Sequence, residues 1–241
     1  MYDRNYGWGR ISIMSNIIDI MYEKTPEITK ESNDIRDNPL KGYRTLYFDN
    51  KIDIRLCPKN ANTSLKYAYS LLHYGIDSPM TFSKRKFVYD LLMEKKEIDE
   101  KSGLLLFRYN SYKIALKRDP IDRALSAVKY LLETRLNIIE PSIELIEEFL
   151  ININLEINEV DHHLLPQTFW MGNSNVYDKI YYVKEFKNMI EYLQDNYIWF
   201  DRIDNIHKNP SKNKLNTNAL SDNTIKKLKK IYEIDYDNGW Y

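Results

Sequence analysis

The fold is decided by the segment IDIRLCPKNANTSL, which spans residues 52–65. Apolar and charged residues alternate over residues 52–56, a pattern typical of a short β-strand. Pro58 ends that strand because proline has no backbone N–H to donate, and apolar residues at helical spacing follow residue 64. The loop of such a strand–loop–helix unit directs backbone N–H groups and the positive end of a helix dipole at one point. With the charge of Lys59 added, the segment predicts a binding site for a phosphate or sulfate group.

A second unit of the same kind begins with the apolar run at residues 112–116. That run leads into Asp119, a favoured helix N-cap, and Pro120, a favoured first helical residue. Arg118 offers a planar fork of donors suited to a phosphate, and Ser126 places a hydroxyl about two turns into the helix. Taken alone, each unit also fits an ordinary capped helix after a strand. The inference of a phosphate-binding site therefore depends on the two units occurring together.

Together the two units resemble the cofactor-binding motifs of sulfotransferases that use 3′-phosphoadenosine 5′-phosphosulfate (PAPS). Pro-Lys-x-x-x-Thr-Ser-Leu at residues 58–65 resembles the loop that binds the 5′-phosphosulfate. Arg-Asp-Pro-x-x-Arg-x-x-Ser at residues 118–126 resembles the motif that binds the 3′-phosphate. A polar turn near residue 209 resembles a further segment close to the cofactor. The cofactor contacts that this resemblance implies are Lys59, Asn60, Ala61, Asn62, Thr63, Ser64, Leu65, Arg118, Ser126 and Lys212.

The fold implied is α/β, a central parallel sheet with helices on both faces, as in the P-loop-like sulfotransferases. We expect one domain, with residues 1–49 as a lead-in and residues 50–241 as the sulfotransferase domain. The pattern further predicts an edge strand near residues 43–48, a helix at 84–96, a strand at 104–107 and a helix beginning at 141–142. It also predicts a strand at 177–186, a helix at 187–193 and a last helix capped by Ser221.

The reaction implied is transfer of a sulfuryl group to an acceptor hydroxyl. Lys59 would stabilise charge on the leaving 5′-phosphate, and a general base would take the acceptor proton. His162 and His163 are the candidates for that base, because histidine titrates in the right range and residues 163–167, His-x-x-Pro-Gln, resemble carbohydrate-type members of the family. Spacing favours His162 of the two. Weaker candidates are His73, Glu94 and Glu97. For any single histidine, a packed or solvated side chain is the commoner role.

Composition limits the remaining possibilities. The 35 Lys and Arg residues balance 35 Asp and Glu residues, so nothing global indicates nucleic acid as a partner. The single cysteine, Cys57, excludes an intrachain disulfide and a cysteine-based zinc site, and we expect a buried structural thiol. We expect no metal. No apolar run has the length of a membrane span, and the first ten residues lack a signal pattern, so we expect a soluble, intracellular (cytoplasmic) enzyme.

Three hypotheses follow. The leading one is a PAPS-dependent sulfotransferase with a carbohydrate acceptor. A kinase that uses ATP would place its lysine after the loop, as in G-x-x-x-x-G-K-[ST], whereas Lys59 stands at the loop's start. A non-catalytic nucleotide- or glycan-binding module with the same fold is the third.

Overall fold

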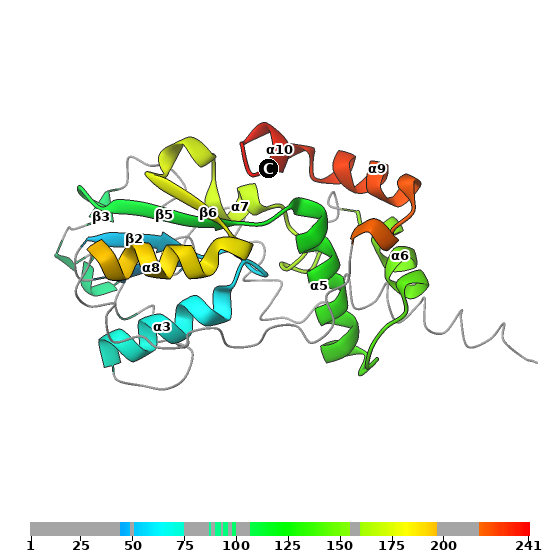
Figure 1. Cartoon of the computed structure of the whole chain (residues 1–241), viewed down its shortest axis with the longest axis horizontal. Helices are drawn as coiled ribbons and strands as arrows, with labels where there is room; N and C mark the ends of the chain where they lie inside the picture. Colours follow the sequence, from blue (N-terminus) through cyan, green and yellow to red (C-terminus); the bar gives the residue numbers. More distant parts are fainter. Residues whose placement is uncertain are drawn as a thin grey trace, which may run out of the picture.

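The computed structural model describes residues 44–48, 51–74, 87, 90–92, 94–95, 98–99, 107–154, 160–196 and 217–241, with only the backbone of residues 73–74 and 98–99. Its centre is a four-stranded sheet in the order β1-β2-β5-β6 (Figure 1). The strands are β1 (Thr45–Phe48), β2 (Ile52–Arg55), β5 (Tyr112–Lys117) and β6 (Lys179–Tyr182). The chain is therefore of the α/β class.

The prediction of a parallel sheet is right for three strands and wrong for the fourth. Strand β2 pairs parallel with β5, and β5 pairs parallel with β6. Strand β1 lies at the edge, as predicted, but runs antiparallel to β2. The reason is the short connection between Phe48 and Ile52, because a parallel pair needs a crossover of a dozen or more residues.

Both faces of β2 are buried, although its sequence alternates apolar and charged residues. Ile52 and Ile54 lie in the apolar cluster on one side of the sheet. On the other side, the Asp53 carboxylate accepts hydrogen bonds from the backbone N–H and Nε of Arg108, at 2.6 and 2.8 Å. Arg55 donates from Nε to the carbonyl of Trp170 at 2.7 Å. Burial of these charges is tolerated because each has polar partners.

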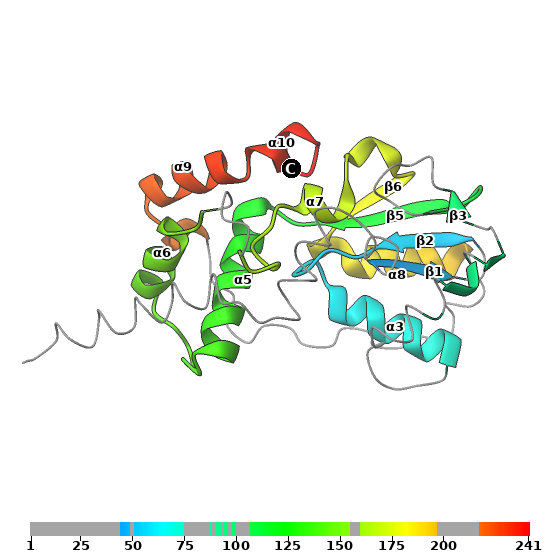
Figure 2. The same cartoon turned by 180° about the vertical axis from the view of Figure 1, so that it is seen from behind.

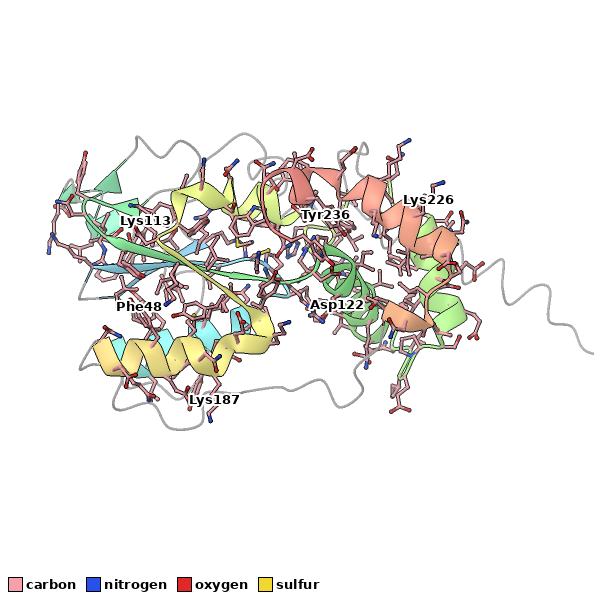
Figure 3. All side chains as sticks on the ribbon, turned by 45° about the horizontal axis from the view of Figure 1, so that its top comes forward. Phe48, Lys113, Asp122, Lys187, Lys226 and Tyr236 are labelled. Carbon is pink, nitrogen blue, oxygen red and sulfur yellow. The ribbon has the colours of Figure 1, made fainter. Side chains whose placement is uncertain are left out.

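Helices cover the sheet and extend beyond one end of it (Figures 1 and 2). Helix α3 (Asn62–Tyr74) and helix α8 (Phe186–Asn196) pack their apolar side chains against β2, β5 and β6. Figure 3 shows these side chains filling the space between α8 and the sheet. The short helix α7 (Gln167–Met171) packs against the other face, where Trp170 and Met171 join the cluster that contains Ala115 of β5.

A group of helices packs together beyond the carboxyl ends of the strands, and it builds one wall of the site described below. It consists of α5 (Pro120–Arg135), α6 (Ile143–Ile151), α9 (Asp222–Ile231) and α10 (Glu233–Asp237). The predicted caps Asp119 and Ser221 are confirmed, because their side chains accept hydrogen bonds from the first turns of α5 and α9. Ser142 caps α6 in the same way, at the predicted start of that helix.

Strand β6 is shorter than the predicted strand at 177–186. It ends at Tyr182 because the Glu185 carboxylate accepts a hydrogen bond from the Tyr182 backbone N–H at 2.8 Å, which closes a 3-10 turn at Val183–Glu185. A small separate pair is formed by β3 (Ile98–Asp99) and β4 (Phe107–Arg108). The rest of the predicted strand at 104–107, most of the predicted helix at 84–96 and the turn near residue 209 lie outside the described residues.

Candidate active site

Two basic residues follow neighbouring parallel strands and lie at the same end of the sheet. Lys59 follows β2 and Arg118 follows β5, and these strands pair in parallel, so their carboxyl ends lie together. The Arg118 side chain donates from Nη1 to the backbone carbonyl of Lys59 at 3.3 Å. Below them, Asn60 donates from Nδ2 to the carbonyl of Leu116 at 2.8 Å. The structure thus brings together the two motifs that the sequence analysis singled out.

The loop after β2 takes a tight path without glycine. Lys59 and Ala61 have φ angles of 68° and 55°, in the left-handed region that residues other than glycine seldom occupy. Helix α3 then begins at Asn62, so its first N–H groups point back toward the loop. Left-handed residues of this kind collect at ligand-binding loops, where the surrounding contacts hold them in place.

The side chains at the start of α3 differ in their exposure and in the polar groups that they could present to a ligand. Thr63 is exposed, whereas Ser64 is buried. Leu65 lies in the apolar core, so a contact from it to a ligand would have to come from its backbone. Asn60 and Asn62 each bury a side-chain oxygen that has no hydrogen-bond partner among the described residues.

The two cations lie in a partly buried setting that favours an anion. Burial, and next the charge of Arg118, lower the pKa of Lys59 to about 8, while Glu133 opposes the shift. Burial also lowers the pKa of Arg118, with Asp122 opposing it. Two like charges held close together outside bulk water are stabilised by any anion that binds between them.

Tyr130 of α5 connects Lys59 to the histidine pair. Lys59 Nζ lies 4.3 Å from the centroid of the Tyr130 ring, and the rings of Tyr130 and His163 have centroids 4.8 Å apart. Ser126 precedes Tyr130 by one helical turn and therefore shares its face of α5. The Ser126 hydroxyl, which is partly exposed, remains a candidate for the 3′-phosphate.

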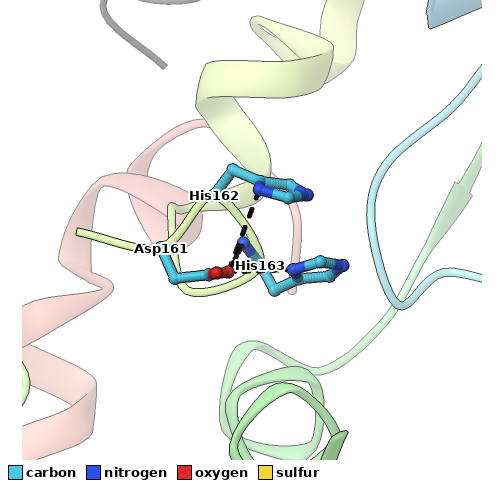
Figure 4. A group of neighbouring side chains, drawn as sticks. All are labelled: Asp161, His162 and His163. Atoms are coloured by element: carbon cyan, nitrogen blue, oxygen red, sulfur yellow. Dashed lines mark hydrogen bonds and ion pairs between the residues drawn. The ribbon is translucent and has the colours of Figure 1, made fainter. Parts of the chain in front are cut away.

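The histidines sit in the loop before α7 and share a carboxylate (Figure 4). Asp161 Oδ1 accepts hydrogen bonds from the backbone N–H of His163 and lies 2.8 Å from His163 Nδ1. His162 Nδ1 lies 3.9 Å from the same oxygen, and the two imidazole rings have centroids 3.9 Å apart. Arg135, at the end of α5, donates to the other carboxylate oxygen at 2.8 Å.

The two rings differ in their contacts to Asp161. Because a carboxylate only accepts, His163 carries its proton on Nδ1 when neutral and presents the lone pair of Nε2 as a base. Burial lowers the pKa of His162 to about 3 and also lowers the pKa of His163, the latter opposed by the hydrogen bond to Asp161. Both rings are therefore neutral at pH 7. The contact through Tyr130 favours His163 as the base, whereas spacing in the sequence favoured His162.

Arg123 holds the histidine loop against α5. Its guanidinium is fully buried and donates to the carbonyl of His163 at 3.0 Å and to the carbonyl of Leu165. Tyr232 adds a hydrogen bond to the carbonyl of Leu164 at 2.8 Å. The helix that follows Arg118 thus also fixes the position of the candidate base.

Gln167 and Tyr130 are the site residues that sequence reasoning missed. Gln167 Oε1 accepts from Asn60 Nδ2 at 2.7 Å and from the Arg118 backbone N–H at 3.0 Å. Its Nε2 donates to the Arg118 carbonyl at 2.8 Å. The only signal for Gln167 is its place in the His-x-x-Pro-Gln element, and nothing in the sequence singles out Tyr130 among 20 tyrosines.

The other candidates fall outside this group or outside the described residues. His73 lies near the end of α3, eleven residues after Asn62, which places its backbone about 16 Å along the helix from the loop. Glu94 is exposed in a short helical segment. Glu97 and Lys212 lie outside the described residues.

Among the described residues, one group of side chains has the ligand types of a metal site, which the sequence analysis did not anticipate. One potential ligand atom each from Asp161, His162 and His163 lies within 4.8 Å of the others. The field around them opposes a divalent cation, because Arg135 already pairs with Asp161 and the charge of Arg44 also acts on both histidines. Burial and the same positive charges also keep both imidazoles neutral.

The thiol of Cys57 is buried beside this site, and burial raises its pKa to about 12. It is therefore an inert packing residue, as predicted. None of the helices in the described part of the chain has both the length and the apolar character that crossing a bilayer requires. Comparison of the chain with protein-family models, curated proteins and solved structures finds no match.

Proposed function

We propose that this chain is a PAPS-dependent sulfotransferase that moves a sulfuryl group to a hydroxyl of an acceptor, with a carbohydrate as the favoured acceptor class. The observation that carries the proposal is the convergence of Lys59 and Arg118, joined at 3.3 Å at the carboxyl ends of two parallel strands. A nucleotide with phosphates at both its 5′ and 3′ positions needs two such anion sites side by side. The P-loop-like sulfotransferase fold belongs to this proposal.

The residues present suit that cofactor. Backbone N–H groups at the start of α3 and the charge of Lys59 would hold the 5′-phosphosulfate, and Arg118 with Ser126 would hold the 3′-phosphate. PAPS supplies an activated sulfuryl group when bound. Lys59 would then stabilise the charge that develops on the bridging oxygen as the 5′-phosphate leaves.

His163 would accept the proton of the acceptor hydroxyl at Nε2. Asp161 holds the ring in the required tautomer through the Nδ1–Oδ1 contact of 2.8 Å, and Arg135 donates to the other oxygen of that carboxylate. Tyr130, which is 38% exposed, contacts both Lys59 and His163, so an acceptor that reaches these two residues would also meet Tyr130.

The test has two arms. The first is thermal unfolding with and without adenosine 3′,5′-bisphosphate (PAP), which at ~100 times its Kd should stabilise the fold by about 2.7 kcal/mol. The second is transfer of ³⁵S from labelled PAPS to a panel of glycans and small alcohols. Stabilisation by ATP but not by PAP would identify a kinase instead, and PAP binding without transfer to any acceptor would indicate a non-catalytic module.

A further inference from the structure

Gln167 joins the loop after β2 to the segment that follows β5, the two parts of the candidate cofactor site. Its side chain is fully buried, and its amide contacts the loop after β2 through Asn60 and the end of β5 through the backbone of Arg118. The partners are 107 and 49 positions away in the chain. The amide group uses both acceptor positions of its oxygen and one N–H, which no other side chain of this length provides together.

We propose that Gln167 sets the spacing between the 5′-phosphosulfate loop and the 3′-phosphate arginine, and that it thereby determines specificity for nucleoside 3′,5′-bisphosphates over nucleoside 5′-monophosphates. This inference rests on the proposed function. Gln167 acts as a positioning residue: it holds Asn60 and Arg118, and those residues or their neighbours meet the ligand.

The position of Gln167 is itself fixed by hydrogen bonds to Asp235 of α10. Its backbone N–H donates to Asp235 Oδ2 at 2.9 Å, and Thr168 donates from its backbone N–H and from Oγ1 to Asp235 Oδ1 at 2.8 and 2.9 Å. Asp235 belongs to α10 and is fully buried. Because α7 begins at this anchored point, the Gln167 amide is held in one place.

A ligand with one phosphate does not sense this spacing, but a ligand with two does. Adenosine 5′-monophosphate (AMP) needs only the loop after β2, whereas PAP must meet the loop and Arg118 at once. Without the Gln167 hydrogen bonds, the loop after β2 and Arg118 can move relative to each other. Binding of PAP must then realign them, at a cost in conformational entropy that binding of AMP does not carry.

The experiment measures the Kd of PAP and of AMP by calorimetry for the wild type, Gln167→Met, Gln167→Asn and Asn173→Ala. Met keeps the volume of Gln167 and removes its hydrogen bonds, whereas Asn keeps the amide on a shorter stem. Asn173→Ala removes an exposed hydrogen bond from Asn173 Nδ2 to Asn238 Oδ1, outside the contacts of Gln167 and of both phosphate loops, and so controls for general loosening. Circular dichroism identifies which variants fold.

We expect Gln167→Met to weaken PAP by about tenfold or more, as the loss of hydrogen bonds in a cofactor site would, and AMP by less than about threefold. Gln167→Asn should act in the same direction, and Asn173→Ala should leave the ratio of the two constants unchanged. A ratio that stays at the wild-type value in the folded Gln167 variants overturns this inference and leaves the proposed function standing. A wild type that shows no preference for PAP over AMP overturns both.

Discussion

The guanidinium of Arg118 donates from Nη1 to the backbone carbonyl of Lys59 at 3.3 Å, across 59 positions of the chain. One arginine therefore braces the loop of the first motif while belonging to the second. A bound 3′-phosphate would add to this contact, since the planar fork has further donors to offer. Replacing Arg118 should therefore distinguish the contribution of the proposed 3′-phosphate site from that of the proposed 5′-phosphosulfate site.

We predict that Arg118→Ala weakens PAP binding roughly 10- to 150-fold, the range expected for losing hydrogen bonds to a charged group. Arg118→Lys should recover only part of this loss, because an ammonium group cannot bridge the phosphate and the Lys59 carbonyl in the same way. Calorimetry measures both. Lys187→Ala is the matched control: it also removes one positive charge, but from a side chain that is 84% exposed on α8 (Figure 3). An effect of Arg118→Ala no larger than the control's would contradict the assignment.

Lys59 should make cofactor binding sensitive to alkaline pH. Burial and the charge of Arg118 lower its pKa to about 8, so the free protein loses this proton as the pH rises through that value. A phosphate binds the charged form, which raises the pKa again. PAP binding should therefore take up a proton near pH 8 and weaken between pH 8 and 9.

Proton uptake is measured by calorimetry in two buffers that differ in ionisation enthalpy. Lys59→Arg keeps its charge over this range, because arginine stays protonated, and should show neither the uptake nor the loss of affinity. Identical pH profiles for the wild type and Lys59→Arg would show that another group titrates. Inorganic phosphate must be kept out of the buffers, because it would occupy the same sites.

The stability of the sheet should depend on Asp53. Its buried carboxylate binds the backbone N–H and Nε of Arg108, and burial raises its pKa despite that charge. Removing one member of a buried ion pair leaves the other charge buried without a partner, which typically lowers the free energy of unfolding by about 3–5 kcal/mol. We expect Asp53→Ala to lower the free energy of unfolding in urea by about this amount. Glu191→Ala, which breaks an exposed ion pair with Lys187, should change it by less than about 1 kcal/mol.

Much of the fold follows from short-range chemistry that a sequence displays. The breaks at Pro58 and Asp119-Pro120 act within a few residues of where they stand, and the start of α3 and α5 follows from them. Strand β5 could be predicted because its apolar run is buried. The same reasoning gave too long a strand near residue 180, because the side chain of Glu185 ends it from three residues away.

The contacts that join the site residues could not be predicted, because they are long-range. Lys59 and Arg118 carry visible signals, since cations that follow strands are typical of anion sites. Gln167 shows no such signal: a buried amide is defined by what surrounds it, and its partners come from two other segments. Asp161 likewise gains its role only when Arg135 and His163 meet it.

The two adjacent histidines are distinguished by replacing each in turn. We predict that His163→Gln lowers the rate of sulfuryl transfer by about 10²- to 10⁴-fold, the usual contribution of a general base, and leaves the Kd of PAP unchanged. His162→Gln, the matched control, removes a neighbouring ring that contacts Trp170 and should lower the rate by less than about tenfold. The reverse ranking would assign the base to His162.

The pH profile provides an independent criterion for the same residue. A base must be unprotonated, so the rate should fall on the acidic side as His163 gains its proton, below the ordinary histidine value because burial lowers the pKa. On the alkaline side the rate at limiting PAPS should fall near pH 8 as Lys59 loses its charge. Asp161→Asn should lower the rate at every pH and shift the acidic limb, because an amide no longer fixes the Nδ1 proton or pairs with Arg135. Lys59→Arg should remove the alkaline limb alone. An acidic limb that persists unchanged in His163→Gln would mean that a group other than His163 takes the acceptor proton.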